Sequence, residues 1–200
     1  TPEAPELQSQ LRGFVESGAT VAAIEVSSHA LDLHRVDGTR FALSNFTNLG
    51  ADHLDFHGTP ERYFEAKARL FEPGLSDHAL VNIDDVHGRL LRDAATVAVD
   101  GYSVDALTDL ELLPSGATFT WRGQHVELPL AGRFNVSNAL AAAEAVRLLG
   151  HDVGSIATAL RQVSTPPGRF EIVDAGQPFG VVVDYAHTPD ALENLLEASR

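Results

Sequence analysis

Cysteine is absent from this 200-residue sequence, which excludes disulfides, thiolate metal sites and cysteine nucleophiles. No apolar run approaches the ~18 uninterrupted residues that a membrane-spanning helix needs, so no membrane span is expected. The polar, acidic start of the sequence lacks the pattern of a secretory signal. We therefore expect a protein of the cytoplasm.

Basic side chains are scarce, because 14 Lys and Arg stand against 28 Asp and Glu, for a formal net charge of −14. A nucleic-acid partner is disfavoured, since such proteins usually present a basic surface. Lysine is scarcer still, because Lys67 is the sole lysine in the sequence. Keeping one lysine where every other cation is arginine suggests a need for amine chemistry, although compositional bias explains it equally well.

The hydrophobic pattern predicts an α/β fold in which a mainly parallel sheet is flanked by helices and accompanied by a small antiparallel hairpin. Strands are expected at residues 21–26, 41–49, 79–83, 95–103 and 179–185, and the hairpin at 117–130. Helices are expected at residues 5–17, 60–71, 138–149, 155–163 and 189–200. Residues 164–170, STPPGRF, are the expected linker. The abrupt start and the short unit after the linker suggest a fragment of a longer protein.

Lys67 falls on the apolar face of its predicted helix, because its neighbours at helical spacing are Tyr63, Phe64, Leu70 and Phe71. Burial of an ammonium is costly and should lower its pKa. A neutral amine can react with carbon dioxide to form a carbamate, an oxygen-rich anion able to bind a metal or orient a phosphate. The alternative is a lysine whose stem is buried while its charge reaches solvent.

The segment DHLDFHG, residues 52–58, follows a predicted strand and is dense in possible ligands and bases. These are Asp52, His53, Asp55 and His57. Ligand sites of open α/β sheets gather at the carboxyl ends of strands, so a functional site is expected here. The spacing leaves open which of the four would bind a metal.

The segment EVSSHAL, residues 25–31, also follows a predicted strand. The Glu25 carboxylate closes an apolar run and needs a partner there, such as a metal ion. Ser27, Ser28 and His29 could contact a substrate, or the serines could simply cap a helix. No GxSxG sequence surrounds them, which argues against a serine nucleophile.

Two later segments carry weaker signals. Residues 132–140 place Arg133, Asn135 and Asn138 near a predicted helix start, and residues 181–189 place Asp184 and His187 after a strand. A phosphate-binding GxxxxGK[ST] loop is absent from the sequence.

Taken together and in order, TPEAP, EVSSHAL, DHLDFHG, YFEAKARLF, GRFNVSNAL and VVDYAHTPDAL resemble the Mur ligase family of peptidoglycan synthesis. The match is strongest to the branch that adds the third peptide residue. The resemblance implies a central ATPase domain at residues 1–166 and the opening β-α unit of a Rossmann-like ligase domain at 167–200. ATP would phosphorylate the D-glutamyl carboxylate of UDP-MurNAc-L-Ala-D-Glu, and a diamino acid would attack the acyl phosphate.

The resemblance also implies a metal centre. Glu25 and His53 would match the family's magnesium ligands, and Lys67 its carbamylated lysine, which supports a second magnesium near the γ-phosphate. His53 and Lys67 would thus be the catalytic residues. Because magnesium prefers oxygen to imidazole nitrogen, manganese would fit as well.

The remaining roles concern the two substrates. By resemblance, the UDP-muramoyl dipeptide would contact Thr1, Ser27 and Arg35. By the same resemblance, the nucleotide would be held by Asn138, Arg169 and Asp184. The expected third residue is meso-diaminopimelate, with lysine left open, and a monomer is expected.

The sequence departs from the family in lacking the uridine-binding domain, the phosphate-binding loop and most of the ligase domain, so we expect residues 1–200 alone to be inactive. Alternatives within the superfamily are a folylpolyglutamate synthase-like or a cyanophycin synthetase-like ligase, which EVSSHAL disfavours. A hydrolase with a carbamylated lysine and a histidine-bound metal, or a non-catalytic binding module, are alternatives of other classes.

Overall fold

Two compact units make up the chain, of which this computed structural model describes residues 1–50 and 52–199. The units interleave, because the chain leaves each of them and returns. Unit 1 consists of Thr1–Ser44, His53–Ala79 and Leu90–Asp100. Unit 2 consists of Asn45–Asp52, Leu80–Arg89 and the chain from Gly101 onward. The domain border expected between residues 166 and 167 stays a prediction.

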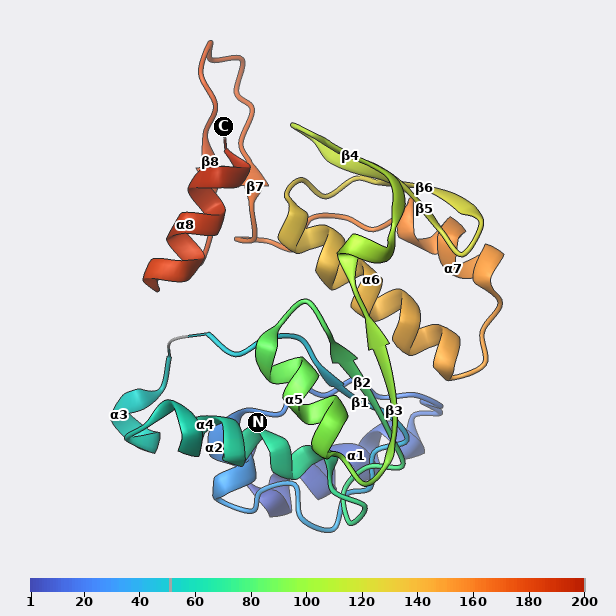
Figure 1. Ribbon diagram of the computed structural model, residues 1–200, viewed down its shortest axis with the longest axis vertical. Helices are drawn as coiled ribbons and strands as arrows, with labels where there is room; N and C mark the ends of the chain where they lie inside the picture. The colour runs from blue at the N-terminus through green and yellow to red at the C-terminus, as the bar shows by residue number, and fades with distance from the viewer. Residues whose placement is uncertain (51, 200) are drawn as a thin grey trace. The chain divides into compact units, whose positions relative to one another are not determined.

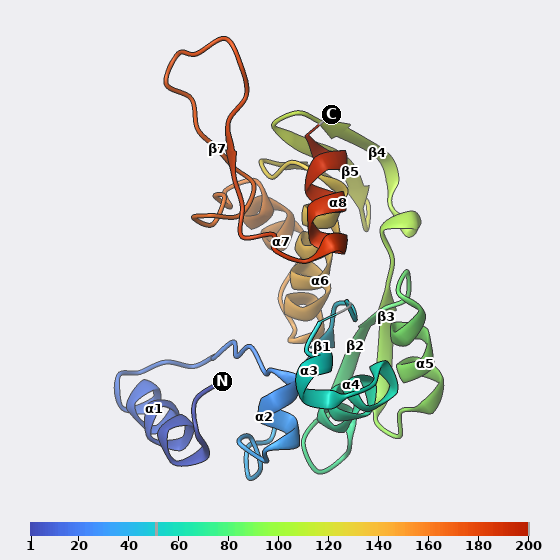
Figure 2. The same cartoon turned by 90° about the vertical axis from the view of Figure 1, so that its left-hand side faces the viewer.

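Helices dominate unit 1, and α4 packs against both α2 and α3 (Figure 2). Their bounds are α1 Ala4–Glu16, α2 Ser28–Asp32, α3 Leu54–His57, α4 Pro60–Ala68 and the 3₁₀ turn η1 Arg69–Phe71. The core of the unit joins α1 and α2 to the segment after η1 and is formed by Leu7, Leu31, Val36 and Leu75. The helices predicted at residues 5–17 and 60–71 are confirmed. The sequence pattern does not predict helices α2 and α3, because they are too short to show a 3.6-residue period.

A three-stranded parallel sheet has its strands in the order β1-β2-β3. Its strands are β1 Ser44–Phe46, β2 His78–Asn82 and β3 Ala98–Tyr102. The middle strand is closed off from water, since Ala79, Leu80 and Val81 are completely buried. Helix α5, Val86–Ala94, follows β2 closely because Gly88 has no side chain: a Cβ there would lie 1.8 Å from the Asn82 carbonyl oxygen.

This sheet confirms the predicted α/β class, but the strand predicted at residues 21–26 is wrong. Within the described chain these residues form no strand, and Val21 is 69% exposed. The run is largely alanine and valine with no neighbouring strand to pair with among the described residues, so it buries little apolar area. It ends instead near the N-terminus, where the Thr1 hydroxyl donates to the carbonyl oxygen of Glu25 at 2.8 Å.

Unit 2 contains an antiparallel sheet covered by two helices (Figure 1). The elements are β4 Thr108–Leu113, β5 Gly116–Trp121, β6 Gln124–Leu128, α6 Arg133–Leu148 and α7 Val153–Leu160. The predicted hairpin is β5-β6, and its two-residue turn puts Arg122 at φ 47° and Gly123 at φ 78°. Both residues of such a turn need positive φ, which the glycine supplies without strain. Strand β4 is missed from sequence because its residues are mostly exposed and do not alternate.

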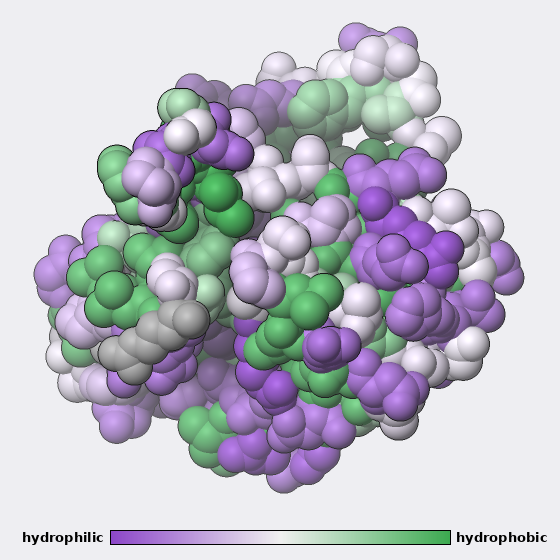
Figure 3. Space-filling view, turned by 90° about the horizontal axis from the view of Figure 1, so that it is seen from above, coloured by the Kyte–Doolittle hydropathy of each residue, from purple (hydrophilic) through white to green (hydrophobic). Residues whose placement is uncertain are grey.

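The last elements are the two-residue strands β7, Glu171–Ile172, and β8, Val182–Val183, and helix α8, Pro189–Ala198. The strand predicted at residues 179–185 is therefore shorter than expected, pairs antiparallel with β7 and is exposed rather than buried. Phe179 and Leu196 are also exposed, and Figure 3 shows such apolar surface mixed with polar residues on one face. Among the described helices, none is both long and apolar enough to cross a membrane.

Candidate active site

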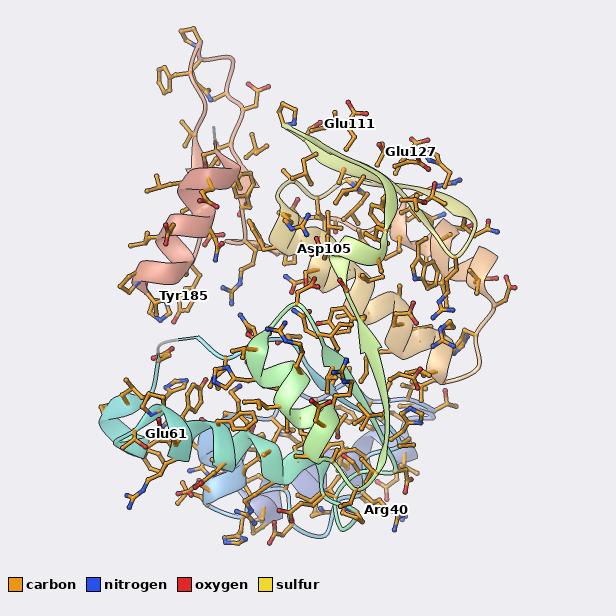
Figure 4. The ribbon with its side chains drawn as sticks, in the orientation of Figure 1. Arg40, Glu61, Asp105, Glu111, Glu127 and Tyr185 are labelled. Carbon is orange, nitrogen blue, oxygen red and sulfur yellow. The ribbon has the colours of Figure 1, made fainter. Side chains whose placement is uncertain are left out.

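Helix α4 places Lys67 on a largely buried face. Thr59 caps the helix, accepting from the Arg62 amide at 3.3 Å, and Pro60 begins it, with Glu61 in the first turn (Figure 4). Lys67 itself is partly buried, as its helical spacing predicts. Burial lowers the pKa of its ammonium, and the negative charge of Glu25 opposes that shift.

An aromatic ring lies next to this lysine. Its Nζ lies 5.3 Å from the centroid of the Tyr63 ring, one helical turn away. The same ring meets His53 edge-on, with centroids 5.7 Å apart. His29 lies next to His53, with centroids 4.9 Å apart, so the histidines of EVSSHAL and DHLDFHG meet in space. The sequence suggests a site at each segment, and the structure brings the two together in unit 1.

His57 is the buried member of this cluster, with 6% of its surface exposed. Its Nε2 and the Ser28 hydroxyl are 2.9 Å apart, which ties α3 to the first residue of α2. Burial lowers the pKa of His57, and the neighbouring His29 lowers it further. Both effects favour the neutral form of His57, which serves as a hydrogen-bonding ring within the cluster.

Thr1, Ser27 and Arg35, the residues expected at the muramoyl substrate, are connected by hydrogen bonds. The Thr1 hydroxyl accepts from the Ser27 amide at 3.1 Å, and the Arg35 guanidinium donates to the Thr1 carbonyl oxygen at 3.4 Å. Arg35 also pairs with Glu3 at 2.6 Å, a contact that sequence reasoning missed. In the sequence, the glutamate of TPEAP is the one signal for this ion pair, because a carboxylate is the natural partner of a binding arginine.

The donor set around Lys67 is sparse for a metal ion. No group of three or more His, Asp or Glu side chains within the described residues is arranged to hold a metal ion. Glu25 supplies a carboxylate and His53 an imidazole, whereas an ammonium at Lys67 would repel a cation. Conversion of Lys67 to a carbamate would turn it into an oxygen donor. Magnesium usually takes one or two protein ligands and completes its shell with water and phosphate, so such a sparse set suffices.

The residues expected at the nucleotide lie in unit 2. Arg169 and Asp184 are brought close: the Asp184 carboxylate accepts from the amides of Phe170 and Ala186, each at 2.7 Å, and Arg169 lies 5.0 Å from the centroid of the Tyr185 ring (Figure 4). Asn138 is exposed on α6, and the described contacts do not link it to Arg169 or Asp184.

The other weak candidates have structural partners. Arg133 pairs with Asp105, and the side-chain Nδ2 of Asn135 donates to the Ala131 carbonyl oxygen at 2.8 Å. The His187 ring hydrogen-bonds the Tyr185 carbonyl oxygen at 2.8 Å. Asp55 lies exposed in the first turn of α3.

Two family models match the chain, and they confirm the resemblance. The Mur ligase middle domain matches residues 1–146, and the Mur ligase glutamate ligase domain matches residues 168–200. The chain belongs to the Mur ligase family.

The relatives point to one branch of the family. UDP-N-acetylmuramoyl-L-alanyl-D-glutamate–2,6-diaminopimelate ligase of Streptomyces coelicolor is 46% identical over 212 residues, covering 100% of this chain and 42% of the relative. UDP-N-acetylmuramyl-tripeptide synthetase of Roseiflexus is 42% identical, covering 100% and 44%. A solved structure of a 2,6-diaminopimelate ligase matches with a TM-score of 0.83 at 37% identity, covering 99% of this chain and 43% of that one. The chain thus spans less than half the length of these relatives.

Proposed function

We propose that the protein is an ATP-dependent amide ligase of peptidoglycan precursor synthesis, which joins 2,6-diaminopimelate to UDP-MurNAc-L-Ala-D-Glu. The observation that carries this proposal is the partly buried Lys67, which lies over the Tyr63 ring and feels the charge of Glu25, with His53 against the same ring. The names of relatives at 46% identity support the substrates. Such soluble nucleotide-linked substrates imply action in the cytoplasm, by the complete protein, of which residues 1–166 would be the central domain and 167–200 the start of the ligase domain.

Phosphoryl transfer to a carboxylate must bring two anions together, and this sets what the site has to supply. Magnesium, when bound by Glu25 and His53, would screen the charge of the phosphates. Lys67 would first become a carbamate: its neutral amine nitrogen bonds to the carbon of carbon dioxide and loses one proton to water. The lowered pKa of Lys67 favours that neutral amine. The resulting carboxylate would support a second magnesium.

Thr1, Ser27 and Arg35 would position the muramoyl dipeptide. The Thr1 hydroxyl is occupied by backbone contacts at Glu25 and Ser27, so its part is to fix the segment that carries the metal carboxylate. Arg35, held by Glu3 and Thr1, presents the positive charge that an anionic substrate requires.

Asn138, Arg169 and Asp184 would hold the nucleotide. Arg169 can approach phosphate as a fixed cation because Tyr185 supports its guanidinium plane. Asp184 shapes the same segment through the amides of Phe170 and Ala186.

The test is a ligation assay with the full-length protein, ATP, magnesium and UDP-MurNAc-L-Ala-D-Glu. We expect one ADP and one phosphate for each diaminopimelate incorporated, and little incorporation of lysine. Incorporation of lysine instead would correct the substrate. The absence of any amide product, with ATP consumption unaffected by the dipeptide, would refute the ligase function.

A further inference from the structure

Tyr63 contacts three groups of the candidate site at once. Its ring stacks on His57, with centroids 5.2 Å apart and planes 26° from parallel. It meets His53 at 84°, edge to face, and it carries the Lys67 ammonium 5.3 Å from its centroid. Only 6% of Tyr63 is exposed. A flat ring enclosed in this way has little freedom to move without displacing its neighbours.

The ring is also anchored from outside α4. His57, which stacks on it, is itself buried and hydrogen-bonded to Ser28 at the start of α2. Ser28 follows Ser27, whose amide is tied to Thr1. Contacts from α2 and α3 therefore define where the Tyr63 ring lies, and the ring in turn lies against the two residues whose separation matters for a metal.

We propose that Tyr63 is a positioning residue, whose ring fixes the Lys67 amine relative to the His53 imidazole so that both can serve the metal centre. This rests on the proposed function, since it assigns Tyr63 a role through the residues expected to hold magnesium. Leucine in its place would keep an apolar side chain but would supply neither the stacking on His57 nor the attraction of a ring face for an ammonium. Lys67 would then sample several rotamers, and its carbamate would lose its fixed place.

The variants that test this are Tyr63→Phe, which keeps the ring, and Tyr63→Leu, which removes it, each in the full-length protein. Tyr102→Leu is the matched control, because Tyr102 is another buried tyrosine, 4% exposed, in β3. The readouts are the ¹³C signal of the carbamate in metal-free protein with labelled bicarbonate, assigned by its loss in Lys67→Ala, and the manganese concentration for half-maximal binding.

For Tyr63→Leu we expect the carbamate signal to fall severalfold and the manganese concentration to rise about tenfold. In the ligation assay kcat should fall about tenfold while KM for the muramoyl dipeptide stays within about twofold. Tyr63→Phe and Tyr102→Leu should leave the carbamate signal and manganese binding as in the wild type. Wild-type values for Tyr63→Leu, or equal losses in Tyr63→Phe and Tyr63→Leu, would overturn the role of the ring.

A measurement on the wild type keeps the proposal testable if Tyr63→Leu does not fold. With ¹³C-lysine labelling, the protons next to the Lys67 Nζ, which lies 5.3 Å from the centroid of the Tyr63 ring, should be shifted upfield, and Tyr63→Phe should retain the shift. An unshifted Lys67 signal would overturn the proposal. Failure of the proposed ligase function can be told apart from failure of the Tyr63 proposal, because the wild type itself would then form no amide product.

Discussion

Lys67 in unit 1 and Glu144 in unit 2 are both charged residues withdrawn from solvent. They differ in the number of partners that compensate their charge. The Glu144 side chain, 8% exposed, accepts from Trp121 at 2.8 Å, from Arg122 at 2.8 and 3.0 Å and from Arg147 at 2.7 Å. Lys67 has an aromatic ring and the more distant charge of Glu25, and within the described residues no ion pair reaches it.

The difference separates structural charge from reactive charge. A buried carboxylate whose oxygens are all satisfied stays ionised and holds elements together, here the β5-β6 hairpin and α6. A buried amine with incomplete compensation has a lowered pKa and is available for chemistry. Removing each charge should therefore damage a different property of the protein.

The largest expected effect is on catalysis, from Lys67→Ala in the full-length protein. Loss of the carbamate should lower ligase activity about 1000-fold, because a metal-orienting carboxylate is removed. Unfolding free energy should change by about 1 kcal/mol or less, since no ion pair is broken. Steady-state assays and urea unfolding measure the two quantities.

Chemical rescue provides the control for this variant. Short carboxylic acids should restore part of the activity of Lys67→Ala by occupying the space of the carbamate, and matched amines should not. Undiminished activity in Lys67→Ala would show that the lysine is a structural residue and would remove the contrast with Glu144.

The next largest effect is on stability, from Glu144→Ala. We expect unit 2 to lose about 3 kcal/mol, because two arginines and the Trp121 indole lose their common acceptor. Trp121 is the sole tryptophan of residues 1–200, so its fluorescence during urea unfolding reports on the stability of unit 2. Glu144→Gln, which keeps one acceptor oxygen, should lose less. A stability equal to the wild type in both variants would contradict the structural role.

The same carboxylate predicts a dependence of stability on pH. Burial by itself would raise the pKa of Glu144, but hydrogen bonds from Arg122, Arg147 and Trp121 outweigh it and hold the pKa below its ordinary value of 4.5. Stability from a lowered carboxyl pKa is present above 4.5 and is lost as the pH falls through the folded-state value. Glu144→Gln should show a flatter acid limb than the wild type in urea titrations.

The smallest effect compares helix caps in the two units. Thr59→Ala removes the side chain that accepts from the Arg62 amide, and Asp152→Ala removes the one that accepts from the Ser155 amide at 2.9 Å. Each should cost about 1 kcal/mol of unfolding free energy. Thr59→Ser and Asp152→Asn, which retain a capping oxygen, should stay close to the wild type. A much larger loss of unfolding free energy in Thr59→Ala would show that the start of α4 also stabilises the contacts of Lys67 and Tyr63.

Much of the fold can be predicted from the sequence wherever the pattern is local. The caps and proline of α4 mark its start, and the alternation around Arg122 and Gly123 marks the hairpin. The run at residues 21–26 misleads because apolar residues favour a strand only if a neighbour is there to pair with. That neighbour depends on tertiary structure, which no window of the sequence contains.

The candidate site divides in the same way. Helical spacing places Lys67 beside Tyr63, because the two are four residues apart on one helix. The pairing of His57 with Ser28 and of Arg35 with Glu3 spans about 30 residues, so only the folded chain reveals it. Which residues bind metal, substrate and nucleotide stays a prediction drawn from the family.

His53 is the N-cap residue before α3 and has a backbone φ of 58°, in the left-handed region that residues other than glycine seldom occupy. That conformation carries a local strain of about 1–2 kcal/mol, which a glycine at position 53 would relieve. The fold tolerates the strain because contacts with His29 and Tyr63 hold the imidazole in place. During sequence drift, position 53 would then be under two opposing pressures: the backbone favours glycine or asparagine, while the site favours histidine.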